Sequence, residues 1–152
     1  MNLSAFEWLR GYPGGGDHKP LFKFLIWILQ DSKHGAASRT DEFMIKDIIS
    51  DVCLLLQNDI EGNELIWFVS AMPITLPRKA EHEWKMWAEI GSNDGWPKEA
   101  VINCAIARAA YYACLARTKF QYAADVWLWV ASADTLESFA NASAEKLKEI
   151  LA

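Results

Sequence analysis

The sequence lacks the residue patterns that mark most metal and catalytic sites. It has three histidines and three cysteines in 152 residues, and it contains no CxxC pair, no GxGxxG loop and no GxSxG elbow. His82 and Glu83 begin like the zinc-protease motif HExxH, but Met86 stands where the second histidine is required, so two imidazoles cannot bind one metal ion. We therefore expect no metal ion, no cofactor and no catalytic residue. The one alternative is a catalytic triad whose residues lie far apart in the sequence, because sequence spacing does not reveal such a triad.

A phosphate-binding loop is also missing. Gly14, Gly15 and Gly16 precede a predicted helix, where free backbone N–H groups favour anions. The Walker pattern is absent, however, and Asp17 would place a negative charge where the phosphate must lie. We interpret the three glycines as a flexible connector.

Positive charge and long apolar runs are scarce. The chain has 15 Lys and Arg against 20 Asp and Glu, a net charge of −5, and no basic stripe interleaved with aromatic residues, so we expect no nucleic-acid partner. The longest strongly apolar stretch, residues 20–29, includes Lys23 and is about half as long as a membrane span. The N-terminus lacks the basic start and the cleavage site of a signal peptide. We therefore expect no membrane association.

The few cysteines predict free thiols. Cys53, Cys104 and Cys114 are odd in number, and each lies in an apolar helical pattern. Cys104 and Cys114 would lie about 15 Å apart along one helix, which is too far for a disulfide. Because buried free thiols fit a reducing compartment, we predict a cytoplasmic protein.

Apolar and aromatic residues are abundant instead. They make up 52% of the chain, which has eight tryptophans. From Val101 to Ala116 only Asn103 and Arg108 are neither apolar nor aromatic, and a second apolar segment, residues 120–133, follows at once. A surface helix keeps a polar face, so both segments must be covered on most sides. A helical hairpin that turns near Thr118 therefore organises the predicted fold.

The whole chain, residues 1–152, predicts a single all-α domain, a bundle of five to eight helices around this Ala- and Trp-rich hairpin. Apolar residues at three-and-four spacing make residues 41–57 the clearest amphipathic helix, with Thr40 as its cap. The other predicted helices cover residues 3–10, a segment after Asp17 that ends near 33–35, residues 77–90 from Pro77 to the stop at Gly91, residues 97–116, and a terminal helix from Ser143. A buried strand is the alternative for residues 21–29. Residues 64–72 fit a helix or a strand, and any sheet is expected only within residues 64–76.

Arg108 is the one charge inside the first apolar helix. An unpartnered charge there is costly, so the side chain should reach water or meet a carboxylate. Asp125 is the only charge within the second helix. In a hairpin that turns at Thr118, the two residues are offset by roughly 4.5 Å along the axis, which an arginine can bridge. We therefore expect a structural pair between Arg108 and Asp125.

Acidic residues gather in the segment 41–64, which contains seven acids against the single base Lys46. Asp47 and Asp51 fall on the side of the predicted helix opposite its apolar stripe. Such a concentration can steer a basic partner, although an ordinary solvated helix face is the alternative. We predict Asp47 and Asp51 as partner-binding residues.

Trp127 and Trp129 should serve different surfaces. Two residues apart on a helix, they point about 200° from one another. Trp127 shares its stripe with small apolar residues, whereas the stripe of Trp129 carries Asp125. We therefore predict that Trp127 lies in the core and that Trp129 is available as an interface residue, since tryptophan is enriched among interface hot spots.

These features favour a small non-catalytic protein that binds another protein through an acidic and aromatic surface. An inhibitor, an immunity-type antagonist or an adaptor would fit, with Asp47, Asp51 and Trp129 as the candidate contacts and a basic surface on the partner. One alternative is a small-molecule-binding protein or an enzyme, with a pocket between helices lined by Tyr111, Tyr112, Trp127 and Trp129. Another is a structural subunit of a homo-oligomer.

Overall fold

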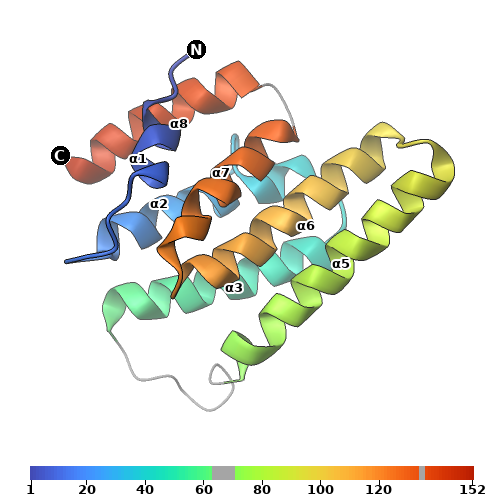
Figure 1. Cartoon of the computed structure of the whole chain (residues 1–152), viewed down its shortest axis with the longest axis horizontal. Coiled ribbons are helices and arrows are strands. Elements are labelled where there is room, and N and C mark those ends of the chain that lie inside the picture. Colours follow the sequence, from blue (N-terminus) through green and yellow to red (C-terminus); the bar gives the residue numbers. More distant parts are fainter. Residues whose placement is uncertain (63–70, 134–135) are drawn as a thin grey trace.

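The protein is an all-α bundle, as the sequence predicts. The computed structural model describes residues 1–62, 71–133 and 136–152, and these residues contain seven α-helices, two short 3₁₀ helices and no strand (Figure 1). The elements are α1 (Ser4–Arg10), α2 (Lys19–Gln30), η1 (Ala36–Arg39), α3 (Phe43–Glu61), α5 (Met72–Asp94), α6 (Lys98–Ala116), η2 (Phe120–Tyr122), α7 (Ala123–Ser132) and α8 (Leu136–Leu151). Of the segment predicted as helix or strand, residues 64–70 lie outside the described residues, and the part from Met72 onward is helical.

Helix α6 occupies the centre of the bundle. It packs against α5 on one side and α7 on the other, and it also contacts α2 and α3 (Figure 1). Most of its buried residues are alanines, namely Ala100, Ala105, Ala107, Ala109, Ala110, Ala113 and Ala116. Because alanine projects only a methyl group, neighbouring helices approach α6 closely on several sides. The predicted hairpin is confirmed, with the turn between Ala116 and Phe120.

Helix α3 buries the predicted stripe. Ile45, Ile48, Ile49, Val52, Leu55 and Leu56 are all buried. The predicted cap was wrong, because α3 (Phe43–Glu61) starts two residues later than expected, so Glu42 is the N-cap and no side chain caps the helix. The hydroxyl of Thr40 instead accepts a hydrogen bond from the backbone N–H of Glu42 at 3.1 Å in the turn before the helix. At the other end, Gly62 adopts the left-handed conformation with φ of 67° and terminates the helix.

The predicted limits of α5 were wrong at both ends. The helix begins at Met72, so Pro77 lies inside it, and Pro73 occupies the early position that tolerates the missing N–H. Gly91 continues the helix, which ends instead at Gly95 with φ of 75°. The ring of Trp96 lies against Gly91, where a Cβ atom would come within 2.4 Å of the ring. Gly91 therefore provides space for an indole rather than a helix stop.

The predicted end of α2 and the predicted start of α8 were also wrong. Helix α2 ends at Gln30, because the Asp31 carboxylate accepts the backbone N–H groups of Lys33 and His34 at 3.2 and 2.9 Å and forms a turn there. Helix α8 begins at Leu136, seven residues before Ser143. Ser143 is fully buried, and its hydroxyl donates to the carbonyl of Ala140.

Trp127 joins the two ends of the chain, and its predicted place in the core is confirmed. It is 1% exposed, and its ring lies 5.3 Å from that of Phe6 in α1 and 5.4 Å from that of Phe139 in α8. Its indole N–H donates to the hydroxyl of Ser143 at 2.9 Å. Helix α7 thereby holds both terminal helices.

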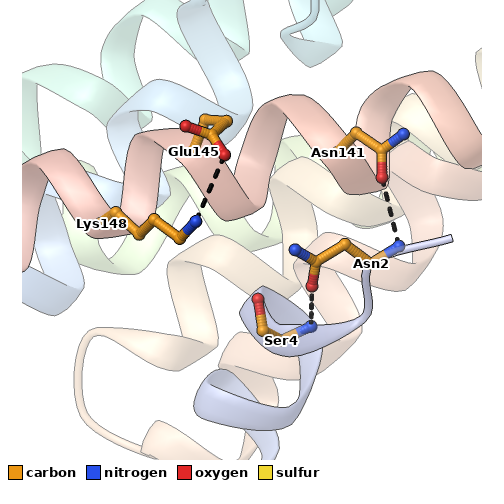
Figure 2. Close-up of polar contacts among 5 residues, drawn as sticks. All are labelled: Asn2, Ser4, Asn141, Glu145 and Lys148. Atoms are coloured by element: carbon orange, nitrogen blue, oxygen red, sulfur yellow. Dashed lines mark hydrogen bonds and ion pairs between the residues drawn. The ribbon is translucent and has the colours of Figure 1, made fainter.

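The N-terminal segment also contacts α8 directly. Figure 2 shows the backbone N–H of Asn2 donating to the side-chain oxygen of Asn141 at 3.2 Å, while the side-chain oxygen of Asn2 accepts the N–H of Ser4 at 3.0 Å. One turn farther along α8, Lys148 and Glu145 form an exposed ion pair. The first residues of the chain are therefore positioned on the last helix. Among the described helices, none combines the length and apolar composition needed to cross a membrane.

We expect Trp127→Ala to lower the free energy of unfolding by about 3–5 kcal/mol, because it empties a large buried site. Ser143→Ala should cost about 1–3 kcal/mol, since the indole N–H would lose its acceptor. Leu128→Ala, at a half-exposed position next to Trp127, is the control and should cost about 0.5 kcal/mol. Urea titrations followed by circular dichroism measure all three. Equal losses for the three variants would contradict the central role of Trp127.

Candidate binding surfaces

Arg108 is held between two indole rings. Its guanidinium carbon lies 4.3 Å from the centre of the Trp84 ring and 4.5 Å from that of Trp129. Because Trp84 belongs to α5 and Trp129 to α7, this clamp connects both neighbours of the central helix. Each cation–π contact contributes about 0.5–2 kcal/mol, with larger values where water is excluded.

The predicted pair between Arg108 and Asp125 was wrong. The register of the hairpin explains this, because Trp129 stands eleven residues after Thr118 and Arg108 stands ten residues before it. Trp129 therefore lies level with Arg108, and Asp125 lies about one turn away along α7. Among the described residues Asp125 forms no ion pair, and burial raises the pKa of its carboxyl group. The cation is thus accommodated by aromatic faces and not by a carboxylate.

The surroundings of the clamp are rich in donors. The Nε of Arg108 and the indole nitrogens of Trp84 and Trp87 are buried with no hydrogen-bond acceptor among the described residues. Cys104, one turn before Arg108, donates its thiol to the carbonyl of Trp84 at 3.5 Å. Burial raises the pKa of this thiol, and the charge of Arg108 opposes the shift. Apart from this thiol, packing and cation–π contacts connect α6 to α5 around the clamp.

Trp129 faces away from Trp127, as predicted. Trp127 points to α1 and α8, whereas the half-buried Trp129 stacks on Arg108 toward α5. A single pocket lined by Tyr111, Tyr112, Trp127 and Trp129 does not fit this arrangement. Tyr112 stacks on Tyr122 with ring centres 5.6 Å apart, and Trp127 is buried toward the terminal helices. The interface role of Trp129 stays a prediction.

Asp47 lies on the outward side of α3, where the sequence places it, and Asp51 lies at the edge of that side, next to α5. Asp47 is exposed, and Asp51 is half-buried near Lys79 of α5. Burial raises the pKa of Asp51, the neighbouring charge of Asp47 raises it further, and Lys79 opposes both effects. Trp129 is not part of this face, because α3 packs against α2, α5 and α6, whereas α7 packs against α1, α2, α6 and α8.

Part of the acidic segment is neutralised within the fold. The guanidinium of Arg117, at the end of the α6 region, binds the carboxylate of Asp59 through two hydrogen bonds of 2.7 and 3.0 Å. Glu64 lies outside the described residues. The negative charge offered to a partner is therefore concentrated nearer the start of α3, around Asp47 and Asp51.

Apolar side chains on the same face were missed by the sequence reasoning. Phe43 is 75% exposed and Leu54 is 44% exposed. Phe43, Asp47 and Leu54 are separated by four and seven residues, which places them on one stripe of α3. We call the outward surface formed by Phe43, Asp47, Asp51 and Leu54 the α3 face. A helical wheel of residues 43–57 would have predicted this exposure, because it places Phe43 and Leu54 on the polar side of the helix.

Several hollows lie elsewhere on the surface of the described residues. A groove of about 460 Å³ between α2 and α8 contains Trp27, Ile150 and the ion pair of Lys146 with Glu149. A smaller cavity of about 350 Å³ lies beside the first turns of α6 and includes Thr40 and Asn103. The described residues contain no group of three or more His, Cys, Asp or Glu side chains arranged to hold a metal ion.

Comparison with known proteins finds no matching family model, no similar curated protein and no similar solved structure.

We expect substitutions of Arg108 and of Asp125 to change the stability in different ways. Arg108→Lys keeps the charge but loses the planar group that stacks on two indoles, so we expect the free energy of unfolding to fall by about 1–2 kcal/mol.

Asp125→Asn should leave the free energy of unfolding at pH 7 equal or higher. Folding raises the pKa of the Asp125 carboxyl group, so the folded state disfavours its ionised form. The contribution of this group to stability is therefore lost as pH rises from its ordinary pKa through the raised one.

Denaturant titrations between pH 3 and 7 measure both effects, and Asp125→Asn should remove that part of the pH dependence. A clear loss of stability in Asp125→Asn would restore the ion pair with Arg108 as the better description.

Proposed function

We propose that this chain is a non-catalytic cytoplasmic protein that binds another protein through the α3 face, as an inhibitor, an immunity-type antagonist or an adaptor. The observation that carries the proposal is the 75% exposure of Phe43 on the same stripe as Asp47 and Leu54. A helix face that is merely solvated gains nothing from a phenylalanine in water. A partner that covers this ring would gain about 1.5–3 kcal/mol from its burial.

The charges on the α3 face indicate a partner with a basic, partly apolar surface. Asp47 is exposed and Asp51 already has a raised pKa, because burial and Asp47 disfavour its ionised form. A lysine or arginine of the partner, placed beside these two carboxylates, would lower that pKa. Binding would then release protons, so the affinity should fall as pH is lowered through the range of the raised pKa. The apolar side chains provide affinity and the carboxylates provide steering.

The thiols support the proposed compartment. Cys53, Cys104 and Cys114 are free. Burial raises the pKa of Cys53 and of Cys114 to about 12, so both are unreactive thiols packed among apolar side chains. This arrangement fits a reducing environment.

A photo-crosslinking amino acid at position 43 tests the proposal in the native cell. We expect a discrete crosslinked product, whereas the same group at Leu136, which is 40% exposed on α8, should give none. The captured protein is then purified and its affinity is measured by calorimetry. A product that is a dimer of this chain would replace the proposal with the homo-oligomer alternative. The same products from both positions would contradict a specific α3 face.

With the purified partner, the double variant Asp47→Asn, Asp51→Asn should bind at least about tenfold more weakly at low salt, and the difference should shrink as salt screens the charges. Its stability at pH 7 should be unchanged or slightly higher, since folding disfavours the ionised form of Asp51. The double variant Phe43→Ala, Leu54→Ala should lose affinity at every salt concentration.

The control for both variants is Glu137→Gln, Glu145→Gln, which removes two exposed acids from α8. It should bind like the parent protein. If the Asn double variant also bound as tightly as the parent at low salt, the acidic residues of α3 would be a solvated surface only.

A further inference from the structure

The α6–α7 hairpin carries two opposite charges that have no ion-pair partner. Arg108 of α6 and Asp125 of α7 are both half-buried, and neither forms an ion pair with a described residue. The two helices lie side by side (Figure 1), and the register of the hairpin sets Asp125 about one turn from Arg108 along their axes. The two charges therefore share one surface without meeting each other.

The aromatic clamp leaves the N–H groups of Arg108 available. The guanidinium carbon lies 4.3 Å from the ring centre of Trp84 and 4.5 Å from that of Trp129. Nε is buried without an acceptor, whereas the two terminal nitrogens reach the surface and are bonded to no oxygen of the described residues. A guanidinium group directs its N–H donors within its own plane, so stacking on its faces does not use them. Arg108 is therefore held in place for a carboxylate that comes from outside this copy.

Asp125 has the opposite requirement. Burial raises the pKa of its carboxyl group, and no described cation lowers it. Removing a charge from water is costly unless a partner compensates it. Asp125 would therefore gain from a cation that a second molecule brings, and it lacks what Arg108 offers.

The side chains around these two charges are of the kinds that dominate protein interfaces. Trp129, Tyr112 and Tyr122 are half-buried, and Leu128 is 44% exposed. The rings of Tyr112 and Tyr122 stack with their centres 5.6 Å apart, so they are ordered before any partner binds. Tryptophan, tyrosine and arginine are the residues most enriched among interface hot spots. We call the surface formed by Arg108, Tyr112, Tyr122, Asp125 and Trp129 the hairpin face.

The charges of the hairpin face are complementary to those of the same face on a second copy. In a dimer with a two-fold axis, every contact across the interface occurs twice, with the roles of the two copies exchanged. An axis that passes between Arg108 and Asp125, perpendicular to the face, places Arg108 of each copy on Asp125 of the other. Both unpaired charges are then compensated, which a partner with a uniformly acidic or basic surface would not achieve.

We propose that this chain forms a two-fold symmetric homodimer through the hairpin face, with two reciprocal ion pairs between Arg108 and Asp125. Trp129 and the stacked tyrosines surround these pairs and keep water away from them. The hairpin face shares no residue with the α3 face, so the dimer does not depend on the proposed function.

Sedimentation equilibrium of the purified protein, up to millimolar concentration, tests the dimer. We expect a monomer–dimer equilibrium with no larger species, and dimers should weaken with added salt because the ion pairs lie near the surface. A two-fold interface closes at the dimer. A monomer at every concentration, or a series of larger species, would therefore overturn the proposal.

Asp125→Arg is the main variant, because it sets arginines against each other at both contacts of the dimer. We expect the dimer affinity to fall by at least about tenfold. Glu137→Arg makes the same change in net charge at an exposed position of α8 and is the matched control. It should dimerise like the parent protein. Equal dimerisation of the two variants would contradict the role of Asp125.

A mixture of two variants tests whether the ion pairs are reciprocal. Arg108→Glu reverses the other charge and should prevent dimers when it is alone. Mixed with Asp125→Arg it should form dimers under conditions where neither variant does so by itself, because each mixed pair again joins an acid to a base at both contacts. A mixture of two folded variants that stays monomeric would overturn this arrangement.

The unmodified protein decides the question if Arg108→Glu fails to fold. In nuclear magnetic resonance spectra recorded during dilution, we expect the indole N–H signal of Trp129 to shift. That of Trp96, which is 47% exposed at the turn between α5 and α6, should not. An unmoved Trp129 signal would contradict the proposal. The double variant Asp47→Asn, Asp51→Asn should dimerise normally, and a loss of dimers would instead indicate head-to-tail contact between the α3 face and the hairpin face.

Discussion

The burial of α6 on nearly all sides is the constraint on which the other contacts depend. Its alanines let α5 and α7 pack closely against it, and α2 and α3 also contact it. A helix in this position must find a partner for every polar group that it carries. It carries two such side chains between Val101 and Ala116, and each one ties the helix to its surroundings. Arg108 joins α5 to α7 through two indole faces, and Asn103 fixes the residues before α3.

The sequence predicts the parts of the fold that depend on repeated patterns. The stripe of α3, the apolar hairpin and the opposite directions of Trp127 and Trp129 each rest on helical periodicity, and all three are confirmed. Helix limits rest on single residues, and several of those were wrong. Pro77 and Ser143 resemble helix starts by residue type, but Pro73 takes the role of the first, and the hydroxyl of the second is used by Trp127. Such roles depend on partners from other helices.

The same distinction applies to the candidate binding surfaces. Charge counting and helical periodicity predict the positions of Asp47 and Asp51. The exposure of Phe43 cannot be predicted in this way, because it depends on the absence of a covering helix among the described residues. The sequence predicts that Arg108 either reaches water or meets a carboxylate, and the structure shows a half-buried side chain that lies between two indoles. An aromatic clamp requires one tryptophan from each of two helices at the same level as Arg108, and only the packing of α5 and α7 on α6 shows this. The hydrogen bond between Thr40 and Asn103 likewise joins residues 63 positions apart, so it appears only in the packed bundle.

The position of Trp127 between α1 and α8 has a consequence for the order in which the protein folds. Helix α1 rests on the ring of Trp127 and, through Asn2, on Asn141, so its binding place is complete only when α8 has packed against α7. Closing contacts over so long a stretch of chain carries a large entropic cost that is met late in folding. Until α8 packs, one side of the tryptophan ring and the apolar side of α1 remain uncovered. The packing of α8 therefore decides when this aromatic surface is withdrawn from water.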